Sequence, residues 1–271
     1  MEDIFMKSRQ QSGFTLVEIA VVLVLVGLLL GGILKGQQLI SSARVRNMAD
    51  QNAGIQAAYY GFIDRYRQVP GDMPAALACS AISAEVDANC GGAPTIGGNQ
   101  NGRIDRWEEA GAVWAHLSHS RLLNGSYGGN TATAAQYEAG VLTGQVPGNA
   151  FQQPVLLGFT ADYDDGGAAA GSTVRLAYAF GAGVTPSLLR ELDVKLDDGN
   201  PGRGVVRGTV NTAKPGESTV GGDDFGTGAP GSEVILWSST TGAPCVNNAD
   251  ATGSSWNVDS DNTRCNAVFL Y

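Results

Sequence analysis

A single carboxylate interrupts the most apolar stretch of the chain. The segment GFTLVEIAVVLVLVGLLLGGIL runs from Gly13 to Leu34, and its only charged side chain is that of Glu18. An ionised acid at the centre of a membrane helix costs about 2.5–3.5 kcal/mol on the lenient insertion scale, and such a residue usually faces a partner. No basic side chain lies between Phe14 and Leu34. The sequence therefore predicts that the counter-charge for Glu18 comes from elsewhere.

A second candidate site is the window from Gly97 to Glu108, which nearly matches a twelve-residue calcium-binding loop. Gly102 takes the position of the sharp turn. The predicted oxygen ligands are Asn99, Asn101, the carbonyl of Arg103, Asp105 and Glu108. Because Gly97 replaces the usual first aspartate, we expect either a weak calcium site, with a dissociation constant of about 10⁻⁴–10⁻³ M, or a turn that caps the next helix.

The two histidines of the chain, His116 and His119, lie three residues apart on a predicted helix. This spacing can supply half of a metal site, but no cysteine or third histidine is near to complete it. A Ser–His–Asp triad would need one of them, and no GxSxG nucleophile elbow is present. The sequence favours ordinary surface or core histidines, and it predicts neither an enzyme nor a required cofactor.

The four cysteines fall into two local pairs, Cys79 with Cys90 and Cys245 with Cys265. None has the CxxC spacing of a zinc or redox site. Two local disulfides are the simplest interpretation of an exported domain. Three pairings are possible, however, and unpaired thiols would fit a cytosolic protein.

Aspartates also gather in the distal part of the chain, in glycine-rich segments. Asp197, Asp198, Asp223 and Asp224 have the chemistry of a second cation site, although clustered Asp and Gly usually form solvated turns. The 38 glycines, concentrated after position 90, predict a β-rich part with many loops. With 17 basic and 26 acidic side chains the net charge is −9, which opposes nucleic-acid binding as the main activity.

The apolar run that contains Glu18 is long enough to cross a membrane. About 20 residues of helix span the roughly 30 Å of a hydrocarbon core. Lys7 and Arg9 precede the run, so the positive-inside rule keeps the N-terminus in the cytoplasm and exports the chain after Leu34. A cleaved signal peptide, with residues 41–43 as its cleavage site, is the alternative. The length of the run and the presence of Glu18 oppose it.

The hexapeptide GFTLVE at 13–18, followed by the apolar helix, resembles the processing signature of type IV pilins and type II secretion pseudopilins. The resemblance implies that prepilin peptidase cuts after Gly13, that the new N-terminal residue Phe14 is methylated, and that Glu18 is the glutamate at the fifth mature position. Cleavage would create an α-amine at Phe14. We expect this amine on one subunit to pair with Glu18 of a neighbour, and we expect Glu18 to lack a partner before cleavage.

The resemblance implies a pilin fold of the α+β class, in which a long helix packs on an antiparallel sheet with disulfide-stapled loops. Residue spacing independently continues the helix to about Arg67, before Pro70. Its predicted buried stripe is Val45, Met48, Ile55, Tyr59, Phe62 and Tyr66. Asn52 lies on the same face, in the seven-residue interval between Met48 and Ile55. The predicted parts are a leader at 1–13, a membrane helix at 14–34, an amphipathic half at 35–69 and a head at 70–271.

Alternating patterns in the head predict strands at 140–146, 155–160, 173–180, 204–210, 234–238 and 265–271. Helices are expected at 105–123 and 185–195. Three segments resemble the heads of a group of large pilin-like proteins. They are the sequence YRQVPGDMPAA, which begins at Tyr66, the Cys79–Cys90 segment, and the Gly97–Glu108 window with the helix after it.

The expected function is that of a structural subunit of a type IV pilus, with roles in adhesion and motility. The precursor would lie in the inner membrane with a periplasmic head, and would later join a surface pilus or a periplasmic pseudopilus. Its implied partners are prepilin peptidase, other pilin subunits, the assembly platform and a cytoplasmic ATPase motor. One alternative is a type II secretion pseudopilin or minor tip pilin. Another is a membrane-tethered periplasmic enzyme or binding module, with its mature N-terminus at Met1 or Arg44.

Overall fold

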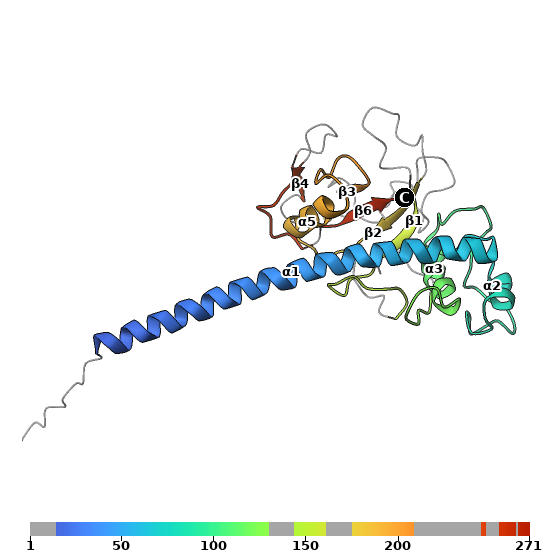
Figure 1. The fold of residues 1–271 in the computed structure, drawn as a ribbon. Coiled ribbons are helices and arrows are strands. Elements are labelled where there is room, and N and C mark those ends of the chain that lie inside the picture. Colours follow the sequence, from blue (N-terminus) through green and yellow to red (C-terminus); the bar gives the residue numbers. More distant parts are fainter. Residues whose placement is uncertain (1–14, 130–143, 161–174, 209–244, 248–254, 264) are drawn as a thin grey trace, which may run out of the picture. The chain divides into compact units, whose positions relative to one another are not determined.

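A computed structural model describes residues 15–129, 144–160, 175–208, 245–247, 255–263 and 265–271. The predicted strand at 234–238, most of that at 140–146, and Gly13, Phe14, Asp223 and Asp224 lie outside these ranges. The chain divides into two units, residues 1–43 and 44–271. The first long helix, α1 (Leu16–Tyr66), begins in the first unit and ends in the second (Figure 1).

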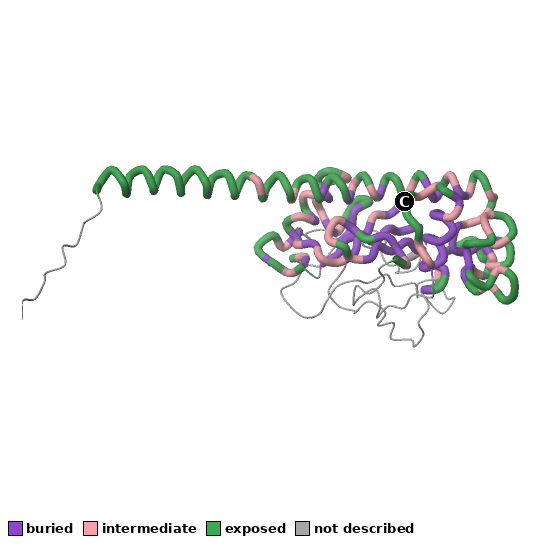
Figure 2. Tube along the Cα trace, turned by 90° about the horizontal axis from the view of Figure 1, so that it is seen from below, coloured by how far each residue is buried: buried purple, intermediate pink, exposed green. Residues whose placement is uncertain are grey.

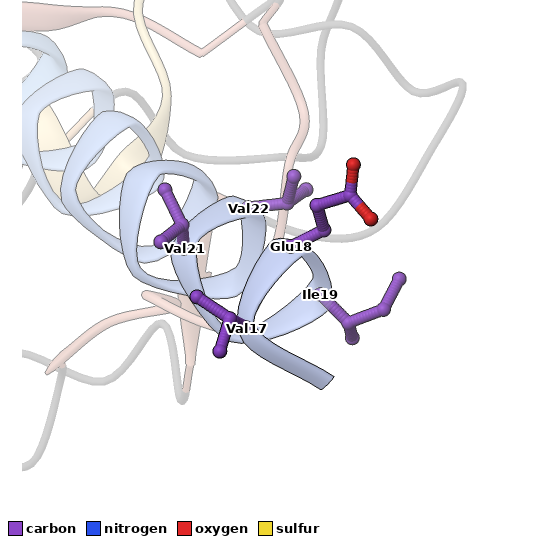
Figure 3. A pocket seen from close by; sticks show the side chains of 5 residues that line it. All are labelled: Val17, Glu18, Ile19, Val21 and Val22. Atoms are coloured by element: carbon purple, nitrogen blue, oxygen red, sulfur yellow. The ribbon is translucent and has the colours of Figure 1, made fainter. Parts of the chain in front are cut away.

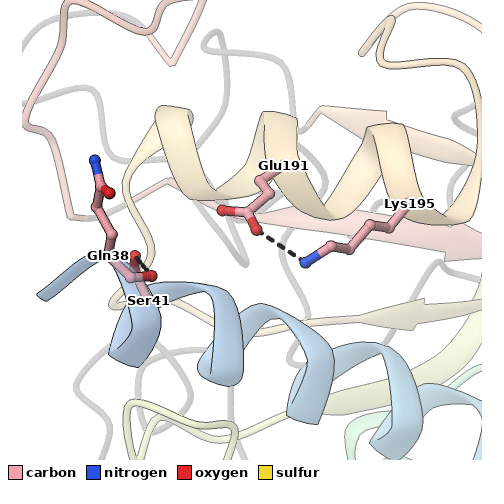
Figure 4. A network of polar contacts seen from close by, with 4 residues as sticks. All are labelled: Gln38, Ser41, Glu191 and Lys195. Atoms are coloured by element: carbon pink, nitrogen blue, oxygen red, sulfur yellow. Dashed lines mark hydrogen bonds and ion pairs between the residues drawn. The ribbon is translucent and has the colours of Figure 1, made fainter. Parts of the chain in front are cut away.

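In the first unit, α1 exposes apolar side chains around its whole circumference. The side chains of Leu16, Leu28 and Leu29 are 90%, 70% and 65% exposed, and Figure 2 shows this part of the helix as exposed along almost its full length. Its most apolar 18-residue window has a mean hydropathy of 2.8. By length and composition, the helix can cross a membrane. Near the end of this unit, the Ser41 hydroxyl donates to the carbonyl of Gln38 (Figure 4).

In the second unit, α1 is amphipathic and packs one face against the head. Its buried residues are Val45, Met48, Asn52, Ile55, Ala58, Tyr59 and Phe62. This is the stripe predicted from the 3.6-residue period, with Ala58 added and Tyr66 half-buried. The last turn closes through a bond from the Arg67 amide to the Ile63 carbonyl, and Arg67 has a φ of 56°. The expected end of the helix, about Arg67, is thus confirmed.

The head is built on a four-stranded antiparallel sheet with the order β1-β2-β6-β3. The strands are β1 (Leu156–Thr160), β2 (Arg175–Ala179), β3 (Val206–Gly208) and β6 (Ala267–Leu270). Each lies within a predicted strand. Tyr178 of β2 pairs with Leu157 of β1 and with Phe269 of β6, and Phe269 also pairs with Val206 of β3. The long helix against this sheet, with disulfide-linked loops, confirms the expected α+β fold.

Helix α3 (Trp107–His119) is largely buried in the head. Its large apolar residues Trp107, Val113, Trp114 and Leu117 are buried. The helix is shorter than the predicted span of 105–123, because backbone bonds from Arg121 and Leu122 to the carbonyls of Ser118 and Leu117 end it.

The remaining elements are short. Helix α5 (Pro186–Leu196) matches the helix expected at 185–195. It has Pro186 in its first turn, and the Thr185 hydroxyl does not cap it. On this helix Lys195 forms a 2.8 Å ion pair with Glu191 (Figure 4). Helix α2 (Ala75–Ala81) and the paired strands β4 (Val246–Asn247) and β5 (Ser255–Trp256) were not predicted.

Candidate functional site

The carboxylate of Glu18 is bound by the residue that precedes α1. The backbone N–H and the hydroxyl of Thr15 donate to Oε2 of Glu18 at 3.0 and 2.9 Å, and the Glu18 N–H donates back to Oγ1 of Thr15 at 3.3 Å. This reciprocal pattern is a capping box, which satisfies amide groups that the first turn of a helix leaves free. Glu18 therefore has a local hydrogen-bond partner, Thr15, that the sequence analysis did not predict.

The capping box supplies hydrogen bonds but no positive charge. Figure 3 shows the Glu18 side chain projecting from the helix, next to Val17, Ile19, Val21 and Val22. These neighbours are apolar. Among the residues that the structure describes, none forms an ion pair with Glu18, and its Oε1 atom accepts no hydrogen bond. Thr15 thus donates hydrogen bonds to the Glu18 carboxylate but supplies no positive charge to balance it.

The sequence analysis did not predict this cap, although the sequence contains a pattern that indicates it. The spacing Thr-x-x-Glu immediately before an apolar run, here Thr15 and Glu18, is the pattern of a helix start. Acidic side chains in a first turn also interact favourably with the positive end of the helix dipole. A glutamate at this position therefore has a local structural reason besides any intermolecular one.

The predicted calcium loop is held by two carboxylates that were outside the predicted ligand set. Asp72 accepts from the amides of Asn101 and Gly102 at 3.1 and 2.7 Å. Glu109 accepts from the amides of Asn99 and Asp105 at 3.2 and 2.9 Å. Two acids therefore satisfy the inward amides of the loop.

The predicted ligands of this loop adopt local turn contacts. The Asn99 and Asn101 side-chain oxygens accept from the amides two residues later, and the Asn101 amide group donates to Asp105 at 2.6 Å. Glu108 is exposed, whereas its neighbour Glu109 is buried. Calcium binding by Asn99, Asn101, the Arg103 carbonyl, Asp105 and Glu108 stays a prediction.

The acids of the loop have raised pKa values. Burial, together with the nearby Asp105 carboxylate, raises the pKa of Glu109 to about 8, although the Asp105 and Asn99 amides favour its charged form. Burial also raises the pKa of Asp72, against three backbone hydrogen bonds. A methyl group at Gly98 would lie 2.5 Å from Cα of Asp72 and 2.8 Å from Oε1 of Glu109, so the close approach of the loop requires glycine.

His116 is a buried structural histidine, as the sequence favoured. The Gly71 amide donates to its Nδ1 at 2.9 Å, and its Nε2 lies 3.3 Å from the carbonyl of Ile96. These contacts require a neutral ring with the proton on Nε2. Burial lowers the pKa of His116 to about 4. The ring joins α3 to two loops and leaves no nitrogen for a metal.

An acidic cluster lies at the end of α5. Oxygens of Asp193, Asp197 and Asp198 lie within 4.8 Å of one another. Asp197 and Asp198 were predicted members of a cation site, whereas Asp193 was not. Oδ2 of Asp193 accepts from Nε1 of Trp256 at 2.7 Å, and its Oδ1 accepts from the Gly199 amide at 3.2 Å. Burial raises the pKa of Asp193 to about 6. The three acids have the chemistry to hold a cation, but Asp193 already has protein donors.

Both cysteine pairs form disulfides. Cys79 is bonded to Cys90 and Cys245 to Cys265, with Cα–Cα distances of 5.5 and 5.6 Å. This is the local pairing that the spacing favours. The first bond joins α2 to the turn after it, and the second joins the start of β4 to the chain that leads into β6.

Comparison with known proteins adds one finding at the N-terminus. Residues 8–34 match the family model described as the prokaryotic N-terminal methylation motif. The matched segment contains Gly13, Phe14, Thr15 and Glu18. No curated protein and no solved structure matches the chain. Since the match ends at residue 34, the resemblance of the head to large pilin-like proteins stays a prediction.

Proposed function

We propose that the protein is a non-enzymatic structural subunit of a type IV pilus or a related pseudopilus. Its precursor would be anchored in the inner membrane by α1, with the head outside the cytoplasm. The observation that carries this proposal is the methylation motif at 8–34 on a helix whose first half is apolar on every side. Such a surface needs lipid before assembly and neighbouring helices after it.

The chemistry proposed for Glu18 begins with the cut between Gly13 and Phe14. Hydrolysis of this amide gives a carboxylate on the leader and a protonatable α-amine on Phe14. The amine of an adjacent subunit would supply the positive charge that Glu18 lacks among the described residues. Because opposite charges attract strongly in a low-dielectric setting, the pair would favour one register between neighbouring helices.

Glycines in the first half of α1 support helix packing between subunits. A Cβ atom added to Gly27, Gly31, Gly32 or Gly36 would meet nothing within 4 Å. Packing among the residues that the structure describes therefore gives no reason for these glycines, each of which costs a helix about 1 kcal/mol relative to alanine. Their small-xxx-small spacing allows close backbone approach between membrane helices.

Two substitutions separate the charge of Glu18 from its capping role. Glu18→Gln removes the charge, while glutamine can still complete a capping box. Thr15→Val removes the hydroxyl and keeps the charge. We expect Glu18→Gln to leave processing largely intact but to reduce filament incorporation severely, and Thr15→Val to retain most incorporation. Processing is read from the N-terminal peptide, and incorporation from the subunit content of sheared fibres. Normal incorporation of Glu18→Gln would overturn the charge pairing.

A pseudopilin or minor tip subunit is the second candidate. The head extends from 70 to 271, and bulk filament subunits of the family are commonly smaller than this chain. Mass spectrometry of sheared surface fibres distinguishes the candidates. A chain that dominates the fibre mass is a major pilin. A chain present in trace amounts, or confined to the periplasm, is a minor subunit or pseudopilin.

A further inference from the structure

A basic pocket lies on the head, where the ends of three helical segments meet. It has a volume of about 510 Å³. Arg65 and Tyr66 line it from the end of α1, Ile82 and Ser83 from the chain just after α2, and residues 119–122 from the end of α3. All of its lining residues belong to the second unit, so a role for this pocket does not depend on the proposed function.

The charge of the pocket is opposite to that of the protein. Arg65, His119 and Arg121 line it, and none of its lining residues is acidic. The chain as a whole carries a net charge of −9. A concave surface lined by one sign of charge concentrates the field and attracts ions of the other sign.

The donors of this pocket are only partly used within the protein. Nη1 of Arg65 donates to the Ser120 carbonyl at 3.3 Å, and its guanidinium lies 5.1 Å from the centre of the Tyr66 ring. In the part of the chain that the structure describes, the Arg121 side chain makes no hydrogen bond or ion pair. The Ser83 hydroxyl accepts from the Glu85 amide at 3.1 Å, and its proton can still be donated.

The backbone of Arg121 gives a second reason to assign it a role. Arg121 has a φ of 62° and occupies the position after the α3 cap that glycine normally takes. The left-handed conformation is unfavourable for a non-glycine residue. The helix dipole explains a basic side chain here in part. Yet Arg65, and not Arg121, donates a side-chain N–H to the last carbonyls.

We propose that this pocket binds a small oxyanion, a carboxylate or a phosphate. A guanidinium matches either group because its parallel N–H donors form two charge-assisted hydrogen bonds. Arg121 supplies the main charge, Arg65 the second, and the Ser83 hydroxyl a neutral donor. The apolar parts of the lining, which include Ile82 and Leu122, suit the carbon skeleton of a sugar acid. The source of the oxyanion is therefore either an inorganic ion or an acidic sugar.

Calorimetric titration of the full-length protein in a neutral detergent at low ionic strength tests this proposal. The probes are inorganic phosphate, glucuronate and, as the uncharged control, glucose. We expect saturable binding of at least one anion and none of glucose. Binding of phosphate would identify a free oxyanion as sufficient. Binding of glucuronate alone would identify an acidic sugar. No binding of either anion, or equal binding of glucose, would overturn the proposal.

Two variants of Arg121 keep the test independent of folding. Arg121→Gln should weaken binding at least tenfold. Arg121→Gly should also weaken it at least tenfold, and should raise the unfolding temperature because glycine adopts a positive φ without strain. Arg190→Gln removes an exposed arginine on α5 and should leave binding unchanged. If both Arg121 variants bind as the wild type does, the pocket is not the binding site.

Discussion

The hydroxyl of Tyr271, directly after β6, donates a 2.5 Å hydrogen bond to Oδ1 of Asn52, which lies on the buried face of α1. Asn52 is the one polar residue in the stripe by which α1 packs on the head, and it is 3% exposed. The bond therefore meets the need of a buried amide and links the helix to the sheet at one defined point.

Tyr271→Phe tests this link, because it removes the hydroxyl and keeps the ring. Asn52 would then be buried with an unsatisfied oxygen, and we expect the free energy of unfolding to fall by about 1–3 kcal/mol. Urea unfolding of the full-length protein measures the change. Tyr60→Phe is the matched control, since Tyr60 is 51% exposed, and it should change stability little. Equal effects of the two substitutions would show that the bond to Asn52 does not stabilise the fold.

Periodicity was sufficient to predict the long elements of this protein. The apolar run and the stripe on α1 have enough repeats to identify one helix, and alternation predicted the four strands of the main sheet. Helix α2 and strands β4 and β5 are too short to have a period of their own. The bond between Trp256 and Asp193 joins residues 63 positions apart, which no local pattern indicates.

The candidate sites were predicted less completely, for two physical reasons. The calcium-loop template placed its last carboxylate at Glu108, but the rotation of α3 turns Glu109 inward and Glu108 to solvent. The apolar run around Glu18 predicted the lack of a counter-charge, but the hydrogen-bond donor next to it, Thr15, was not predicted. A template of residue types fixes neither the phase of a helix nor the direction of a side chain.

Acid should destabilise the head through His116. Its pKa is about 4 in the folded protein, against 6.5 for the ordinary residue. Between these values His116 binds more protons in the unfolded chain than in the folded one, so its own contribution to stability falls as the pH drops from about 6.5 toward 4, by at most about 1.4 kcal/mol per pH unit. Glu109 contributes a slope of opposite sign in this range, so the His116 contribution is read from the difference between variants. Urea unfolding at pH 6.5, 5.5 and 4.5 measures the slope.

His116→Gln provides the comparison for this slope. Glutamine can accept from one backbone group and donate to another but does not titrate. The variant should lose stability at neutral pH and show a smaller loss on acidification. His119→Gln, on the same helix, should keep the slope of the wild type. A slope that His116→Gln leaves unchanged would assign the acid sensitivity to other groups.

Alkaline pH should destabilise the loop that Glu109 holds through the Asn99 and Asp105 amides. Its pKa of about 8 in the folded protein exceeds the ordinary value of 4.5, so the folded protein binds more protons over this interval and its stability falls as the pH rises toward 8. Unfolding measured between pH 6.5 and 8.5 avoids the range in which His116 titrates. Glu109→Gln should flatten the profile. Glu108→Gln, next to it and exposed, should not; identical profiles for the two variants would contradict the assignment.

Calcium binding by the same loop has a direct test. If Asn99, Asn101, the Arg103 carbonyl, Asp105 and Glu108 hold the ion, 5–10 mM calcium should raise the unfolding temperature relative to a chelator, as expected for a dissociation constant of about 10⁻⁴–10⁻³ M. Asp105→Asn should reduce this increase. If calcium has no effect on the wild type, the loop is a turn held by Asp72 and Glu109 alone.

The central claim is that cleavage after Gly13 creates the positive charge that Glu18 requires for assembly. Mass spectrometry of the N-terminal peptide from fibre-associated protein tests it most directly. The account predicts a peptide that begins with N-methylated Phe14. Fibres whose subunits still begin at Met1, with the leader intact and an ordinary amide before Phe14, would contradict it.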